Sequence, residues 1–236
     1  LSIGSPVDPT PPLIAQALAD ATDAHSYPQT VGTPALREAI VEWFARRRGV
    51  SGLTVDHVFP TIGSKELVAL LPLLLGIGEG DAVVYPRAAY PTYEVGAQLV
   101  GAEAVAADDP AQWPTNTRLT WVNTHRNPDG QVLDVDYLSA AVVRARELGA
   151  IIAGDECYAE LGWDAPWDNT AVPSVLDPRV VGDSVDNVLA VYSLSKQSNL
   201  AGYRAGMMAG CSRLIGEILG VRKHLGLMVP APIQAV

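Results

Sequence analysis

Residues 188–209 read VLAVYSLSKQSNLAGYRAGMMA, a polar segment between two apolar runs. The runs Val188 to Tyr192 and Ala205 to Ala209 have the length and apolar character of buried strands. Lys196 and Arg204 stand between them, and a lysine so close to the end of a buried strand is unusual. Taken alone, Lys196 would be interpreted as a solvent-exposed residue. Its neighbours in the sequence favour a different interpretation.

Outward from this stretch, segments with helical spacing of apolar residues alternate with short strand-like runs. Helices are expected at Thr33 to Arg48, Ser64 to Leu75 and Val135 to Leu148. Further strands are expected at Ala82 to Tyr85, Leu119 to Val122 and Ala150 to Gly154, and a long loop at Trp163 to Pro178. The alternation predicts an α/β fold with a mostly parallel central sheet flanked by helices.

Composition narrows the class of protein. A chain of 236 residues with 48% hydrophobic residues can bury a full core, and one large domain is expected. The net charge of −10 is spread along the chain, which argues against nucleic acid or an anionic membrane as a partner. No apolar run reaches the length of a membrane span. An anionic ligand would therefore need a local positive pocket.

Cysteine and histidine usage points to a reducing compartment and to no metal site. Cys157 and Cys211 have neither disulfide nor metal spacing, so both are expected to be buried thiols in a cytoplasmic protein. His25, His57 and His224 are isolated in the sequence, which favours structural roles over metal binding. The chain begins without Met and stops at 233–236 in an apparent apolar helix, so we expect both ends to be incomplete.

Polar residues that follow the expected strands are the candidates for chemistry, because ligands of open α/β sheets bind at the carboxyl ends of strands. Each also has a structural interpretation. Asp155 could cap a turn, Ser64 could cap a helix, Asn127-Pro128 could be an ordinary turn, and Tyr90 could be a core aromatic.

The segment Ser193-Leu194-Ser195-Lys196, followed by Gly202-Tyr203-Arg204-Ala205-Gly206, resembles the cofactor-binding signature of fold-type-I, class I/II aminotransferases that use pyridoxal 5'-phosphate (PLP). The resemblance implies that Lys196 binds the cofactor aldehyde and later moves a proton of the substrate. It assigns Arg204 and Ser193 to the cofactor phosphate, for which the forked guanidinium of arginine is well suited.

Two further segments are similar to the same family. In Asp155-Glu156-Cys157-Tyr158, the resemblance implies that Asp155 pairs with the ring nitrogen and that Tyr158 bonds the ring hydroxyl oxygen. In 123–130, it assigns Asn127 to the same oxygen. His125, Arg126 and Asp129 depart from the usual residues of this turn, which leaves its substrate contacts open.

Residues nearer the start complete the resemblance. Gly63, Ser64 and Lys65, where a strand gives way to a helix, are expected at the cofactor phosphate. Tyr90, in Tyr-Pro-Thr-Tyr, is expected to stack on the cofactor ring. The resemblance also implies a homodimer in which Tyr27 reaches the phosphate of the neighbouring subunit. Gly4 is expected beside the substrate carboxylate.

The resemblance implies a fold-type-I large domain at 26–236, preceded by an N-terminal arm at 1–25 and lacking a C-terminal small domain. Within the family, the segments are most similar to aminotransferases that act on N-succinyl-LL-2,6-diaminopimelate in lysine biosynthesis with the glutamate/2-oxoglutarate pair. Amino-acid and 2-oxo-acid substrates follow from this. Three alternatives stay open: another class I/II aminotransferase, a PLP-dependent carbon–heteroatom lyase, and a PLP-sensing regulatory module, which the acidic charge disfavours.

Overall fold

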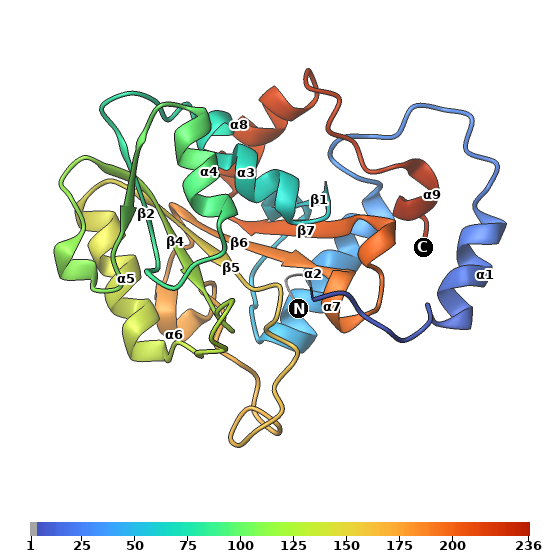
Figure 1. Cartoon of the computed structure of the whole chain (residues 1–236). Helices are drawn as coiled ribbons and strands as arrows, with labels where there is room; N and C mark the ends of the chain where they lie inside the picture. The colour runs from blue at the N-terminus through green and yellow to red at the C-terminus, as the bar shows by residue number, and fades with distance from the viewer. Residues whose placement is uncertain (1–3) are drawn as a thin grey trace.

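The computed structural model describes residues 4–236, so the first three residues of the predicted arm 1–25 lie outside it. Within these residues, seven strands form one sheet in the order β1-β7-β6-β5-β4-β2-β3 (Figure 1). The strands are β1 (Val58–Ile62), β2 (Ala82–Tyr85), β3 (Glu103–Ala106), β4 (Thr117–Asn123), β5 (Ile151–Asp155), β6 (Val188–Ser193) and β7 (Ala205–Gly210).

All neighbouring strands are parallel except at β7, which runs antiparallel to both β1 and β6. The central strands are buried along nearly their whole length, as expected for a sheet covered on both faces. The predicted α/β class with a mostly parallel sheet is confirmed.

Helices cover both faces of this sheet. The longer ones are α1 (Pro12–Asp20), α2 (Pro34–Arg48), α3 (Lys65–Leu74), α4 (Thr92–Leu99), α5 (Val135–Glu147) and α8 (Ser212–Arg222). Residues of α3, α4 and α8 share one apolar core with one face of the sheet, and residues of α2, α5 and the short α6 (Pro178–Val181) share another core with the opposite face. In Figure 1, α3, α4 and α8 lie above the sheet, while α5 and α6 lie below it.

Local sequence explains the limits of α2. The Thr33 side chain accepts a hydrogen bond from the Leu36 N–H, and Pro34 occupies the first helical position, where its missing N–H costs nothing. Gly49 ends the helix in a left-handed conformation with a φ of 66°. Between these limits, Ile40 and Phe44 are buried and attach the helix to the sheet.

Several sequence expectations need correction. The predicted helices and strands occur with ends that differ by at most two residues, but α1, α4, α6, α7 (Leu194–Gln197), α8 and β3 were not predicted. β1 was expected only as a strand of unstated length before Gly63. Ser64 stands at the N-cap of α3, yet its side chain makes no capping hydrogen bond. The expected apolar helix at 233–236 is instead a four-residue helix, α9 (Ala231–Gln234), which ends before the last two residues.

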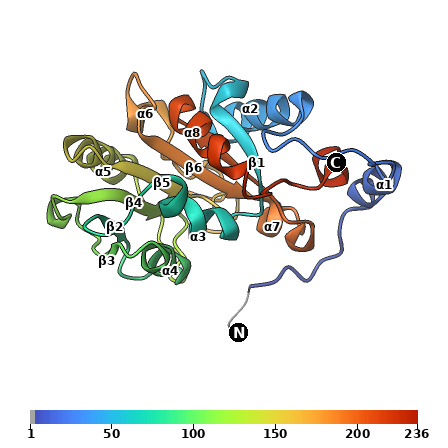
Figure 2. The same cartoon turned by 90° about the horizontal axis from the view of Figure 1, so that it is seen from above.

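Helices α1 and α9, which come from opposite halves of the sequence, lie near each other at one side of the sheet (Figures 1 and 2). Helix α1 has no buried residue and lies beside α9 in both views (Figures 1 and 2). The buried Gln234 accepts a hydrogen bond from the Thr33 N–H at 3.0 Å and donates one to the Gln29 carbonyl at 3.1 Å. This amide therefore joins α9 to the start of α2. Across residues 4–236, no helix combines the length and apolar character needed to cross a membrane.

Candidate active site

A cavity of about 460 Å³ lies at the carboxyl ends of the central parallel strands, a size typical of small-molecule sites. Asn123 and Asp155 end β4 and β5 and are register partners, and Ser193 ends β6. The parallel direction of these strands brings their three polar side chains to one edge of the sheet.

Most of the residues predicted from the sequence line this cavity. They are Gly4, Ser64, Lys65, Tyr90, Asn127, Asp155, Tyr158, Ser193, Lys196 and Arg204. Two predicted residues do not line it: Gly63, which contacts Arg204 from behind, and Tyr27, whose side chain is 94% exposed. The structure also adds lining residues that sequence reasoning missed, namely Ser5, Asn123, Cys157, Ser195 and Ala201.

Asp155 is a buried carboxylate with neutral hydrogen-bond donors. Its Oδ2 accepts a hydrogen bond from the Tyr93 hydroxyl at 2.8 Å, and its Oδ1 accepts one from the Cys157 N–H at 3.2 Å. Burial raises the pKa of the Asp155 carboxyl, while these hydrogen bonds act in the opposite direction. A cationic partner at the open side of the cavity would favour the ionised form. The position therefore suits a protonated ring nitrogen.

Tyr93 holds the Asp155 carboxylate in place through its hydroxyl. Its ring is fully buried and stacks on Trp121 with centroids 5.0 Å apart. Burial, together with the charge of Asp155, raises the pKa of Tyr93 well above its usual range, so the phenol stays protonated and remains a donor. Sequence reasoning missed this role, although Tyr93 belongs to the quoted Tyr-Pro-Thr-Tyr segment.

Lys196 lies in the first turn after β6, in α7 (Leu194–Gln197). Its Nζ donates a hydrogen bond to the Gly4 carbonyl and lies 5.5 Å from the centre of the Tyr158 ring. The amine, the Asp155 carboxylate and the Asn127 side chain thus line one cavity. This arrangement places a nucleophilic amine where a small aldehyde could be held against a carboxylate.

Arg204 and Gly63 meet beside the cavity at a point that we call the anion-binding corner, after the ligand expected there. Ile62 of β1 pairs with Ala205 of β7, so the residues that adjoin them, Gly63 and Arg204, meet at the end of the two strands. The Gly63 N–H donates a hydrogen bond to the Arg204 carbonyl at 2.7 Å. Gly63 has a φ of +66°, which strains other residues, and a Cβ added there would lie 2.8 Å from the Arg204 Cζ, so a larger residue would displace the guanidinium.

The N-terminus of α3 adds donors to this corner. Its first backbone N–H groups have no partner within the helix and carry the positive end of the helix dipole. Ser64 and Lys65 line the cavity at this point. Together with the guanidinium of Arg204, they make a positive pocket in an acidic chain, which suits a phosphate.

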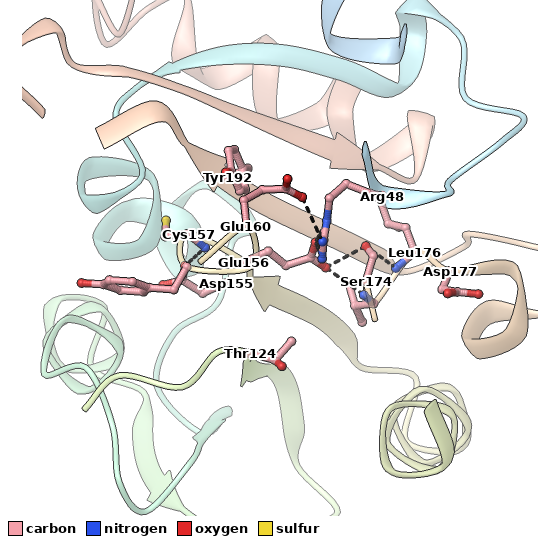
Figure 3. A network of polar contacts seen from close by, with 12 residues as sticks. Arg48, Thr124, Asp155, Glu156, Cys157, Glu160, Ser174, Leu176, Asp177 and Tyr192 are labelled. Atoms are coloured by element: carbon pink, nitrogen blue, oxygen red, sulfur yellow. Dashed lines mark hydrogen bonds and ion pairs between the residues drawn. The ribbon is translucent and has the colours of Figure 1, made fainter. Parts of the chain in front are cut away.

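A buried ion-pair network supports the turn that carries Asp155 (Figure 3). The Arg48 side chain, which is fully buried, donates to the Glu156 carboxylate at 3.2 Å and lies 3.4 Å from the Glu160 carboxylate. The other oxygen of Glu156 accepts hydrogen bonds from the Ser174 hydroxyl and the Val175 N–H, both at 2.8 Å. The network joins the end of α2 to both sides of the loop after β5.

Asn123 fixes the turn that carries Asn127. Its side-chain amide donates to the Asp155 carbonyl at 2.8 Å, and its oxygen accepts from the Asn127 N–H at 2.7 Å. In the same turn, Arg126 pairs with Asp129 and, at 3.3 Å, with Asp108. Arg126 and Asp129, which both differ from the usual residues of this turn, therefore form an ion pair with each other.

Comparison with known proteins identifies the family. The sequence pattern described as "Aminotransferase class I and II" matches residues 1–236. This chain belongs to that family. Members use PLP, so the predicted cofactor is confirmed at the level of the family, and the buried carboxylate and the anion-binding corner fit its ring nitrogen and phosphate.

The similar proteins are named for different substrates. The chain is 51% identical to the 4-dedimethylamino-4-oxo-anhydrotetracycline transaminase OxyQ of Streptomyces rimosus over 238 residues, covering all of this chain and 64% of that protein. It matches the solved aminotransferase AspB of Helicobacter pylori with a TM-score of 0.89 and 30% identity, over 100% of this chain and 65% of that one. It matches the N-succinyldiaminopimelate aminotransferase of Mycobacterium tuberculosis with a TM-score of 0.87 and 25% identity, over 99% of this chain and 63% of that one.

The chain spans less than two thirds of each of these proteins. Among residues 4–236, no group of three or more His, Cys, Asp or Glu side chains is placed to hold a metal ion.

Gly63 and Gly76 provide a matched test of the anion-binding corner. Both have a positive φ, of 66° and 69°, but only Gly63 abuts Arg204, and nothing lies within 4 Å of a Cβ at Gly76. We predict that Gly63→Ala weakens PLP binding about tenfold or more, because displacing Arg204 removes a charged hydrogen bond, whereas Gly76→Ala leaves it unchanged. Equilibrium dialysis with PLP measures both. Equal losses in the two variants would contradict the role of this corner.

Arg48 and Arg144 test the buried network. Arg48→Met leaves Glu156 buried and unpaired, so we predict a loss of about 3–5 kcal/mol in the free energy of unfolding. Arg144 forms an exposed pair with Glu147, and Arg144→Met is expected to cost about 1 kcal/mol or less. Urea denaturation followed by circular dichroism gives both values. A loss of unfolding free energy in Arg48→Met no greater than that in Arg144→Met would contradict the role of the buried network.

Proposed function

We propose that the full-length protein is a PLP-dependent aminotransferase that exchanges an amino group between an amino acid and 2-oxoglutarate. The observation that carries the proposal is the single cavity lined by the amine of Lys196, the buried carboxylate of Asp155 and the guanidinium of Arg204. Bound PLP would supply an aldehyde and an electron-withdrawing ring, which weakens the bond between the substrate α-carbon and its hydrogen.

Each side chain has a distinct task in this proposal. Arg204, Ser193 and the N-terminus of α3 bind the phosphate. Asp155 holds the positive charge of the ring nitrogen, with Tyr93 keeping the carboxylate in place. Tyr158 and Asn127 orient the ring through its hydroxyl oxygen, and Tyr90 lies against its face. The Lys196 amine, once the substrate has replaced it on the cofactor aldehyde, moves the proton at the substrate α-carbon.

Two kinds of substrate have support. The sequence resemblance favours N-succinyl-LL-2,6-diaminopimelate in lysine biosynthesis as the amino donor. The N-succinyldiaminopimelate aminotransferase of M. tuberculosis has the same fold as this chain. The 51% identity to OxyQ, which is named for a 4-oxo-anhydrotetracycline, favours a larger, ring-bearing substrate whose oxo group accepts the amino group. A carbon–heteroatom lyase would use the same cavity and release ammonia instead of forming glutamate. The proposal also includes a cytoplasmic location, the division into an arm at 1–25 and a large domain at 26–236, and a homodimer.

Lys196 and Lys223 form a matched pair of lysine variants. We predict that Lys196→Ala abolishes both the visible absorption of bound cofactor and the formation of glutamate from 2-oxoglutarate, because the covalent link to the cofactor is lost. Lys223 is exposed at the end of α8, and Lys223→Ala is expected to leave both unchanged. Absorption spectra and a coupled glutamate assay provide the measurements.

The same assay separates the reaction classes. Release of a 2-oxo acid with ammonia, without glutamate, would show a lyase. An unaltered spectrum in the Lys196→Ala protein would rule out the assignment of this lysine.

Subunit mixing tests the proposed dimer. If Tyr27 serves the partner's site, mixing Tyr27→Ala with Lys196→Ala gives heterodimers with one doubly defective site and one intact site, so activity should partly return. Mixing Asp155→Ala with Lys196→Ala is the control, because both residues line the cavity of one chain and no intact site can form. Glutamate formation after proven subunit exchange is the readout. Equal recovery in both mixtures, or none in the first, would refute the shared site.

A further inference from the structure

A second cavity, of about 960 Å³, lies next to the one that contains Lys196. Gly4, Asn127 and Tyr158 line both, so the two spaces adjoin along these residues. We call this second space the loop cavity, because its outer wall is the loop that follows β5 and hangs below the sheet in Figure 1. A substrate held at Lys196 can therefore extend into the loop cavity past Tyr158.

The outer wall of the loop cavity is aromatic. Trp163 and Trp167 line it together with Leu161, and Trp163 is 81% exposed. Gly162 allows the close packing of this loop, because a Cβ there would lie 2.7 Å from the Trp167 carbonyl carbon. The Trp167 N–H donates to the Asp164 carbonyl at 2.8 Å and closes a turn between the two tryptophans. Two indole rings thus stand on one short, tightly packed loop.

The inner wall carries a neutral hydrogen-bonding group. The Nδ1 of His125 lies 2.9 Å from the Tyr158 carbonyl, which can only accept, so Nδ1 carries the proton. Burial lowers the pKa of His125, which leaves the imidazole neutral at pH 7. Its Nε2 is then an acceptor for a hydroxyl or amino group of a ligand.

The charges of the loop cavity disfavour an anionic side chain. Arg126 is the one permanent cation among its described lining residues, and Asp129 and Asp108 already pair with it. Asp129 and Asp164 add two carboxylates to the lining of the loop cavity. A substrate with a carboxylate at its far end would meet these acidic groups, whereas an uncharged flat ring would stack on the indoles.

We propose that the loop cavity receives the side chain of the amino donor and that this side chain is a large, uncharged ring system rather than a chain with a distal carboxylate. The inference rests on the proposed aminotransferase function. It singles out Trp163 as a residue that selects the donor, because most of its indole is free to be covered by a ligand.

The test compares donors in the full-length protein with 2-oxoglutarate as acceptor. The donors are 3-(2-naphthyl)-L-alanine, N-succinyl-LL-2,6-diaminopimelate and L-alanine. We expect the naphthyl donor to have the highest kcat/KM. Trp163→Ala should lower its kcat/KM about tenfold through loss of ring stacking, with less than about a twofold change for L-alanine. Trp163→Phe should restore most of the loss.

Leu99→Ala is the control, because Leu99 is 64% exposed at the end of α4 and lines neither cavity. Its kcat/KM should stay within about twofold of the unmodified protein for every donor, as for an ordinary surface substitution. A preference for the succinylated donor, or an equal effect of Trp163→Ala on all donors, would overturn the inference.

A binding measurement keeps the two proposals distinguishable. If no donor yields glutamate, the proposed function fails, and calorimetric titration with 3-(2-naphthyl)-L-alanine still examines the cavity. Binding about tenfold weaker to the Trp163→Ala protein than to the Leu99→Ala protein would support a ring-binding site. Equal binding to both would overturn it.

Discussion

The buried pair of Arg48 and Glu156 is the constraint on which the candidate site depends. Glu156 follows Asp155 directly in the sequence. The contacts that hold the Glu156 carboxylate therefore also hold the turn that carries the Asp155 carboxylate. The same carboxylate accepts two hydrogen bonds from the far side of the loop. Desolvation of an ion pair buried this deeply offsets much of its attraction, so we expect the pair to act mainly by orienting the turn.

The direction of one strand explains the anion-binding corner. β7 runs against its neighbours, so the chain that leaves Lys196 at the end of β6 passes Arg204 before it turns back along the sheet. Arg204 therefore reaches the same edge as the parallel strands and meets Gly63 from β1. The amine and the guanidinium are close in sequence, and the antiparallel return keeps them close in space.

Sequence reasoning found the residues whose chemistry is unusual for their position and missed those whose role depends on distant partners. Lys196, Asp155 and Arg204 follow or precede strands in recognisable motifs, and all three line one cavity. Arg48 ends a basic helical turn that looks solvated, and its burial depends on a partner 108 positions away. β3 was missed because its short alanine-rich sequence has low strand propensity and is only partly buried. Tyr93 was quoted in a motif, but its hydrogen bond to Asp155 follows from packing alone.

The pairing of β1 with β7 also bears on how the protein is made. β1 contains the buried Phe59 and is synthesised well before β7, its hydrogen-bonding partner in the sheet. On a ribosome, that interval lasts on the order of ten seconds. During this time, the apolar strand has an unpaired edge that can associate with other nascent chains. The order of synthesis therefore leaves residues 58–62 without their native partner until β7 has emerged.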